Sequence, residues 1–190
     1  MPLAHAILGF LEYEPMSGYD LKKHFDQSIA HFWSATQSHI YKALEDLEKD
    51  GWVESQRISQ EGRPNRKQYR ITDTGGDELR RWVHTPLPLD VKREAWLIQV
   101  FFAHGITNEA IIEVFDQRIA AIRHYCAQLQ LAQENIDETY ADMGVERIRD
   151  LWQLTLDYGT SYYAHEIAWL EQTRERIRAL PPLTPIADSR

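Results

Sequence analysis

The chain has 190 residues, of which 43% are hydrophobic and 26% charged, a composition typical of a globular protein with a sizeable core. Its single cysteine, Cys126, excludes an intrachain disulfide framework, and no apolar run approaches the length of about 18 residues that a membrane-spanning helix needs, so we expect a cytoplasmic protein. The net charge of −8 argues against a polyanionic partner, but residues 57–70 carry five cations and one carboxylate, a local charge of +4.

The first 50 residues predict three helices. A short apolar helix ends before Pro15, and Ser17 is the expected N-cap of a second helix, with Asp20 as its capping-box partner. A third helix over 35–50 is indicated by apolar residues three and four positions apart. Gly51 is expected to end it, because a glycine tolerates the left-handed backbone of a helix C-terminus.

The periodicity changes after this third helix. Residues 52–58 and 67–71 have high strand propensity, and the polar stretch 59–66 between them contains glycine and proline, which predicts a β-hairpin with a basic tip. A fourth helix is expected to begin at Thr72. Three helices, a hairpin and a helix in this order predict a winged helix-turn-helix with a two-stranded wing over residues 1–85.

Residues 90–180 have no strand signal and predict an all-helical second domain, so the chain as a whole is expected to be mainly α. A helix over 91–103 is followed by a long helix that Thr107 can cap, and a last helix over 146–180 would be about 50 Å long. The apolar stripe of the last helix is too long to be covered within one subunit, so we expect this domain to form a homodimer. Residues 181–190 are expected to form a flexible tail.

The third helix and the hairpin carry side chains that suit a nucleic acid. In a helix-turn-helix, the first turns of the second helix enter the major groove, where amide and hydroxyl groups can bind base edges. Long cations at a hairpin tip suit the sugar-phosphate backbone or the minor groove. Each feature alone also fits a self-capping helix start or a solvated turn, but the combination favours double-stranded DNA. The candidate DNA-contacting residues are Ser17, Tyr19, Lys22, Ser34, Thr36, Gln37, Ser38, His39, Tyr41, Lys42, Arg63, Asn65, Arg66 and Lys67.

Four segments of the first half share their pattern with a known family. They are Gly18–Leu21, Phe32–Leu44, Leu47–Val53 and Arg63–Thr72. Together they resemble the PadR family of transcriptional regulators, and the second half is similar to the dimerising domain of its longer members. Many members have a proline where this chain has Lys42, and a basic residue there is similar to the phenolic-acid-responsive members. The resemblance implies a repressor that a small aromatic effector releases from its operator. Two recognition helices in one dimer predict that this operator is pseudo-palindromic.

Aromatic residues of the second half could line a cavity for such an effector, with a cation to bind an anionic or phenolic group. Aromatic stripes at helical spacing are more often ordinary core or dimer contacts. The candidate effector-binding residues are Arg93, Trp96, His104, Trp152, Tyr158, Tyr162 and Trp169.

Two other functions stay open. A multidrug-responsive repressor of the same fold would bind flat cationic drugs at the dimer seam, which the acidic net charge would favour. A winged helix that docks on a protein and never meets DNA is the second, because a fold does not determine a function.

No residue pattern predicts an enzyme. His165 and Glu166 begin like a zinc-protease helix, but Trp169 stands where that motif requires its second histidine ligand. No glycine-rich phosphate loop follows a strand, and Cys126 lies on a helix stripe where a buried thiol is inert. We therefore expect no catalytic residues, metal or cofactor, and a dimeric, sequence-specific DNA-binding repressor.

Overall fold

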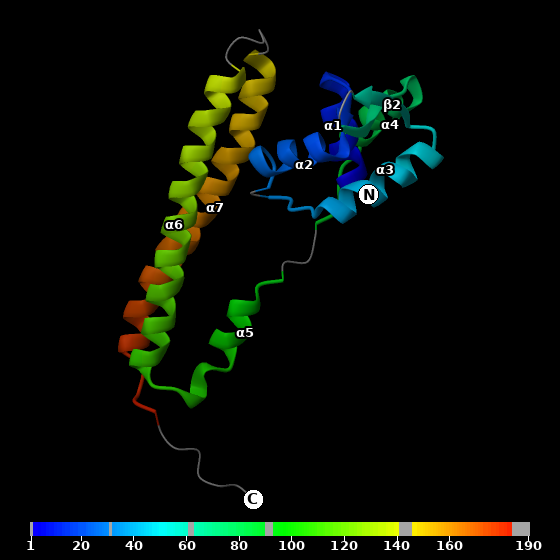
Figure 1. Ribbon diagram of the computed structural model, residues 1–190. Helices are drawn as coiled ribbons and strands as arrows, with labels where there is room; N and C mark the ends of the chain where they lie inside the picture. The colour runs from blue at the N-terminus through cyan, green and yellow to red at the C-terminus, as the bar shows by residue number, and fades with distance from the viewer. Residues whose placement is uncertain (1, 31, 61–62, 90–92, 141–145, 184–190) are drawn as a thin grey trace, which may run out of the picture. The chain divides into compact units, whose positions relative to one another are not determined.

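The computed structural model describes residues 2–30, 32–60, 63–89, 93–140 and 146–183, with the side chains at 59–65 and 131–140 left aside. It divides into two compact units, Met1–Leu89 and Asp90–Arg190 (Figure 1). Among the described residues, no helix has both the length and the apolar character to cross a membrane.

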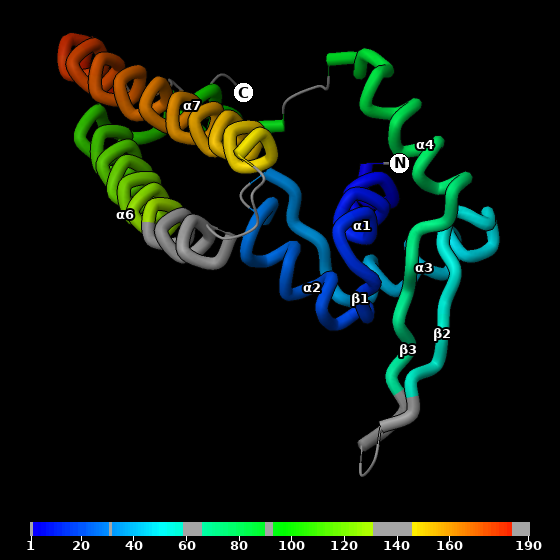
Figure 2. Tube along the Cα trace, turned by 90° about the horizontal axis from the view of Figure 1, so that it is seen from above, coloured from blue at the N-terminus to red at the C-terminus, as the bar shows by residue number. Residues whose placement is uncertain are grey.

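The first unit is a winged helix-turn-helix with a three-stranded antiparallel sheet of order β1-β3-β2. In β2 and β3, which lie side by side in Figure 2, the pairing runs from Val53 opposite Ile71 to Ile58 opposite Arg66. The elements of the first unit are α1 (Pro2–Tyr13), β1 (Met16–Ser17), α2 (Gly18–Gln27), α3 (Gln37–Lys49), β2 (Val53–Gln60), β3 (Arg63–Ile71) and α4 (Asp73–Val83).

Side chains at the helix ends fix where the helices begin and end. The predicted capping box of α2 is present: Ser17 Oγ accepts from the Asp20 backbone N at 3.3 Å, and Asp20 Oδ2 accepts from the Ser17 backbone N at 3.1 Å. Thr72 caps α4 through one bond, with its Oγ1 accepting from the Gly75 backbone N at 3.1 Å. After α3, Gly51 has a φ of 73°, the left-handed backbone that favours glycine.

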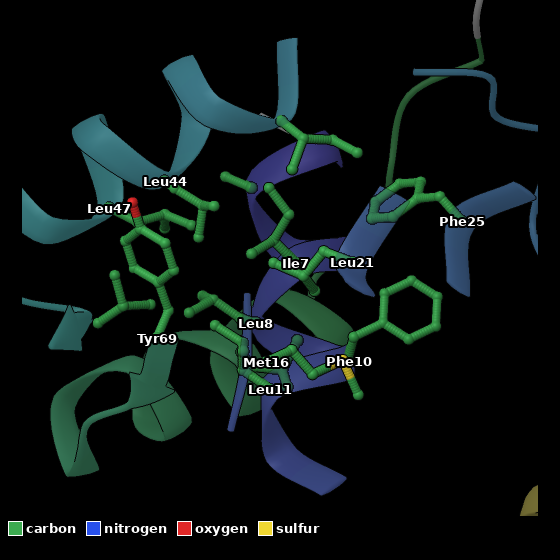
Figure 3. Close-up of a cluster of buried hydrophobic side chains, with 14 residues drawn as sticks. Ile7, Leu8, Phe10, Leu11, Met16, Leu21, Phe25, Leu44, Leu47 and Tyr69 are labelled. Carbon is green, nitrogen blue, oxygen red and sulfur yellow. The ribbon is translucent and has the colours of Figure 1, made fainter. Parts of the chain in front are cut away.

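The core of the first unit forms where the apolar faces of α1, α2 and α3 meet the sheet (Figure 3). Because each helix buries a stripe with a spacing of three and four residues, the opposite faces of α2 and α3 stay exposed. The buried side chains labelled in Figure 3 are Ile7, Leu8, Phe10, Leu11, Met16, Leu21, Phe25, Leu44, Leu47 and Tyr69.

The sheet differs from its prediction in two respects. Both strands extend further into the polar stretch 59–66 than predicted, since β2 continues to Gln60 and β3 begins at Arg63. Backbone pairing at the exposed end of a hairpin needs no apolar side chains, so the polar composition gave no sign of it. The two-residue strand β1 was not predicted, since two residues are too few to show a period.

The second unit is an antiparallel helical hairpin preceded by a short helix. Its elements are α5 (Ala95–Phe101), the 3₁₀ turn η1 (Ala103–Gly105), α6 (Asn108–Tyr140) and α7 (Glu146–Arg178). Helices α6 and α7 lie along one another (Figures 1 and 2) and bury Phe115, Ile119, Ile122, Leu170 and Ile177. The mainly helical fold class, with a winged helix-turn-helix and a helical second half, is confirmed.

The second unit differs from its prediction in the extent of its first helix. Of the helix expected over 91–103, only Ala95–Phe101 is α-helical. The preceding Glu94 has extended backbone, and its carboxylate accepts from Trp96 Nε1; residues 90–92 lie outside the described part. On α7, Tyr158 lies on the apolar stripe that we expect a second subunit to cover and is 71% exposed, whereas Leu170 lies off that stripe and is fully buried. Of the predicted tail, residues 184–190 lie outside the described part.

Candidate functional site

The first turn of α3 is polar and exposed. Thr36 caps the helix, with its Oγ1 accepting from the His39 backbone N at 3.3 Å and lying 2.9 Å from Ser38 Oγ. The side chains of Gln37, Ser38 and His39 are exposed, as is Ser34 in the connection before the helix. The structure thus gathers these predicted residues at one helix N-terminus, where unpaired backbone N–H groups and the helix dipole favour an anion.

Helix α3 buries one face and exposes the other. Ile40 and Leu44 are fully buried, whereas Lys42 is exposed and forms no ion pair with any other described residue. Tyr41 is partly exposed, and its ring lies directly against Gly18 of α2. A Cβ at Gly18 would stand 2.5 Å from Tyr41 Cε1, so this glycine is what allows the ring to pack there. The packing role of Tyr41 was not predicted.

The three residues predicted at the start of α2 have different surroundings. Tyr19 is largely exposed. Ser17 is buried, and its hydroxyl bonds Asp20 Oδ2 at 3.0 Å. Lys22 is paired with Asp26, one turn further along the same helix. Among these three residues, Tyr19 is therefore the side chain most available to a partner.

The wing lies next to the start of α2 because β1 and β3 pair. Ser17 is opposite Gln68 in the sheet, and Gln68 Nε2 donates to the Pro15 carbonyl at 2.8 Å. Arg66 then forms an ion pair with Asp20. Of the other predicted wing residues, the side chains of Arg63 and Asn65 lie outside the described part.

The neighbouring residue Lys67 is paired with α3. Its Nζ donates to Glu48 Oε2 at 2.7 Å and lies 4.8 Å from the centre of the Tyr69 ring. The hydrogen bonds from Lys67 and Ser55 lower the pKa of Glu48, and the bond to Glu48 raises the pKa of Lys67. Both groups therefore stay charged at neutral pH. Neither this pair nor the pair of Arg66 with Asp20 was predicted.

In the second unit, three predicted effector residues meet around an unpredicted carboxylate. Glu94 accepts from Tyr162 Oη at 2.6 Å and from Trp96 Nε1 at 3.1 Å. The rings of Trp96 and Trp169 are 5.6 Å apart, centre to centre, and the Arg118 guanidinium lies 4.3 Å from the Trp96 ring centre. These five residues form what we call the aromatic cluster.

A buried carboxylate adjoins the aromatic cluster. Glu166 of α7 is 7% exposed, and its Oε1 accepts from Arg118 Nε. Its Oε2 is buried and has no hydrogen-bond partner in the part of the chain that the structure describes. Such an oxygen is costly unless a further group pairs with it.

The other predicted effector residues are not brought into this cluster. His104 lines a separate cavity of about 410 Å³ between η1 and the end of α7, which Ile177 and Leu180 also line. Trp152 and Tyr158 lie nearer the beginning of α7, and Arg93 is exposed before α5. The described residues hold no group of three His, Cys, Asp or Glu side chains suited to a metal ion.

Each half of the chain matches the model of a known protein family. The model of the Transcriptional regulator PadR-like family matches residues 7–81, and that of the Virulence activator alpha C-term family matches residues 92–178. The Probable transcriptional regulator Rv1176c of Mycobacterium tuberculosis is 46% identical over 87 residues, 46% of each chain, so the match spans about half of that relative. The Negative transcriptional regulator PadR of Bacillus subtilis is 28% identical over 171 residues, 89% of this chain and 93% of that one.

Solved structures agree with these matches. Bacillus subtilis PadR in complex with operator DNA aligns with a TM-score of 0.79 and 26% identity, over 93% of this chain and 99% of that one. The same protein in complex with p-coumaric acid aligns with a TM-score of 0.74 and 26% identity, over 94% and 99%. The families and relatives that the chain matches are transcriptional regulators rather than enzymes. On these matches, residues 7–81 form a domain of the Transcriptional regulator PadR-like family, and the chain as a whole is similar to Bacillus subtilis PadR.

Proposed function

We propose that the chain is a dimeric, sequence-specific DNA-binding repressor that recognises a pseudo-palindromic double-stranded operator. Residues 1–85 are the DNA-binding domain, and residues 90–180 are the dimerisation and effector domain. The first turns of α3 enter the major groove, and the wing contacts the sugar-phosphate backbone or the minor groove.

The observation that carries the proposal is the exposed polar start of α3. Gln37, Ser38 and His39 offer donors and acceptors that match base edges, and Lys42, one turn on, offers an ammonium group suited to a phosphate. The likeness to Bacillus subtilis PadR, which was solved with operator DNA, supports the same use of this helix.

Selection of bound sequences from a pool of random duplexes tests the proposal. We expect a palindrome whose half-sites are centred about one helical turn, or a multiple of it, apart.

Gln37→Ala should then lower the preference for the selected sequence by about tenfold or more, the value of one good base contact. Lys42→Ala should weaken binding to selected and random duplexes alike and reduce the salt slope by about one. Failure to enrich any sequence, or affinity that ignores ionic strength, would instead support a protein-docking winged helix.

The dimer is supported by exposed apolar surface in the second unit. On α5 no residue is buried, and Ile98 and Phe101 are mostly exposed, as is the following Phe102. On α7, Leu154 and Tyr158 are mostly exposed too. Large exposed apolar side chains of this kind are typical of protein interfaces, and a second copy of the chain would cover them.

The effector we propose is a small aromatic acid of the phenolic type. The aromatic cluster offers stacking surfaces and the Arg118 guanidinium, and Bacillus subtilis PadR was solved with p-coumaric acid. An effector that binds better to the DNA-free form lowers operator affinity, with a coupling free energy of typically about 1–3 kcal/mol.

A specific observation favours the alternative, a flat cationic drug. The aromatic cluster and its neighbour contain two carboxylates, Glu94 and Glu166, but one guanidinium, Arg118, and one oxygen of Glu166 lacks a hydrogen-bond partner among the described residues. Aromatic rings beside a carboxylate with one oxygen that accepts no hydrogen bond from the described residues suit an organic cation.

Titration of tryptophan fluorescence with p-coumaric acid and with a flat cationic dye separates the two effectors. If the effector is a flat organic cation, Glu166→Gln should weaken binding of the dye and should leave binding of p-coumaric acid unchanged or make it tighter. If neither compound alters the fluorescence or the operator affinity, both effector classes are wrong, while the DNA-binding proposal stands.

A further inference from the structure

Two cations of the wing, Arg66 and Lys67, are each held by a carboxylate of a neighbouring helix. Arg66 is paired with Asp20 in the first turn of α2, and Lys67 is paired with Glu48 near the end of α3. Successive residues of a strand point to opposite faces of the sheet. The two pairs therefore hold the base of the wing from both faces of β3.

These pairs involve the groups that a DNA backbone would need. Phosphates bind proteins through cations such as Arg66 and Lys67, and each neutralised phosphate releases counterions. A carboxylate paired with one of these cations neutralises its charge. It also places a negative charge beside the DNA phosphate. In contrast, Arg57, which is opposite Lys67 in the sheet, forms no ion pair with another described residue.

The pairs are accessible enough to open. The side chains are 40% exposed for Arg66, 31% for Asp20, 42% for Lys67 and 36% for Glu48. Ion pairs with this much solvent contact are weak, so a phosphate can replace the carboxylate without a change of fold.

We propose that Asp20 and Glu48 compete with DNA phosphates for Arg66 and Lys67, so that the wing makes its full backbone contact only when these ion pairs open. This inference rests on the proposed DNA-binding function. It identifies two acidic side chains as restraints on DNA affinity, in a region where composition alone shows a surplus of cations.

The pair of Glu48 with Lys67 gives the sharper test, because Glu48 takes no part in a helix cap. Binding is measured by fluorescence anisotropy with a labelled duplex from the selection and with the unselected pool, over a range of KCl concentrations. Glu48→Gln should bind both probes about two- to fivefold more tightly, the effect of releasing one exposed ion pair. Its salt slope should be steeper by up to about one.

The background variant Lys67→Ala separates competition from simple repulsion. If Glu48 competes with a DNA phosphate for Lys67, Glu48→Gln gives no gain in DNA affinity in this background, because the cation that it would release is absent. The matched control Glu45→Gln removes the same charge from an exposed site on the same helix that has no cationic partner among the described residues. Any gain from this control should be equal in the two backgrounds.

The outcomes are distinct. Equal gain from Glu48→Gln with and without Lys67, or no gain, or weaker binding by a variant that melts at the wild-type temperature, would overturn competition by Glu48. The same double-mutant cycle with Asp20→Asn and Arg66→Ala tests the second pair. Asparagine is chosen because it keeps an oxygen that can accept from the Ser17 backbone N–H. If the wild-type chain binds neither probe in a salt-dependent way, the proposed function itself fails.

Discussion

At the scale of single residues, two adjacent glycines in the first turn of α4 are under opposite constraints. A Cβ at Gly75 would stand 2.1 Å from the Trp52 carbonyl oxygen, a backbone atom that is fixed because it also accepts from the Thr72 backbone N. A Cβ at Gly76 would meet only the end of the flexible Arg80 side chain, at 3.4 Å. The two sites thus form a matched pair.

We expect Gly75→Ala to lower the free energy of unfolding by about 1–3 kcal/mol or more, because the backbone must shift. Gly76→Ala should leave it unchanged or raise it by about 0.5–1 kcal/mol, since alanine favours the helix. Urea unfolding of both variants measures the difference. Equal stability of the two would show that Gly75 does not approach Trp52 so closely.

The residue scale also includes a pH-dependent contact between α1 and α4. Hydrogen bonds from Arg81 and then from His5, whose Nε2 lies 2.9 Å from Glu78 Oε1, lower the pKa of Glu78 to about 2. His5 is buried and stacks on Trp82, with ring centres 4.6 Å apart.

Since the pKa of Glu78 is lower in the folded state than its ordinary value of 4.5, its stabilisation is present above pH 4.5 and is lost as the pH falls toward 2. Glu78→Gln should therefore be less stable than wild type at pH 7, with a difference that shrinks between pH 4.5 and 2. Urea midpoints at a series of pH values measure this. A constant difference over that range would contradict it, and Asp77→Asn, at an exposed neighbouring carboxylate, is the control.

At the scale of elements, locally encoded features were predictable and long-range ones were not. The caps at Ser17, Thr72 and Thr107 depend on residues three positions away, and all three are present. The Glu48 and Lys67 side chains that meet in the wing are 19 positions apart, and Glu94 and Tyr162 are 68 apart. No period or spacing reports such pairs, so the site residues could be named but their partners could not.

The same distinction decides which residues hold the helical hairpin together. Leu170 of α7 is fully buried against α6 although it is off the predicted stripe, whereas Val114 of α6 is 42% exposed. Leu170→Ala should lower the free energy of unfolding of the second unit by about 2–5 kcal/mol, because it leaves a cavity. Val114→Ala should change it by less than about 0.5 kcal/mol, which unfolding monitored by circular dichroism can show. Similar losses for both would place the hairpin core elsewhere.

At the scale of the whole molecule, charge and apolar surface are unevenly distributed. The net charge is −8, yet residues 57–70 carry a local charge of +4. Most of the surface should therefore repel a polyanion, while the wing attracts it, and this restricts the orientation in which the protein can approach DNA. Apolar side chains are exposed in both units, and in the second unit they form a surplus on α5, which has no buried residue.

Dimerisation should depend on that surplus. Phe101 of α5 is 79% exposed, and a symmetric interface would bury it twice, so Phe101→Ser should weaken the dimer by at least about tenfold. Sedimentation equilibrium measures this, with Leu87→Ser, at an exposed site in the first unit, as the control. At protein concentrations below its dimer dissociation constant, the Phe101→Ser variant should also lose affinity for a palindromic duplex but not for a single half-site, because one chain then binds alone. A monomeric wild-type chain at micromolar concentration, or a variant that dimerises as before, would show that this surface is not the dimer interface.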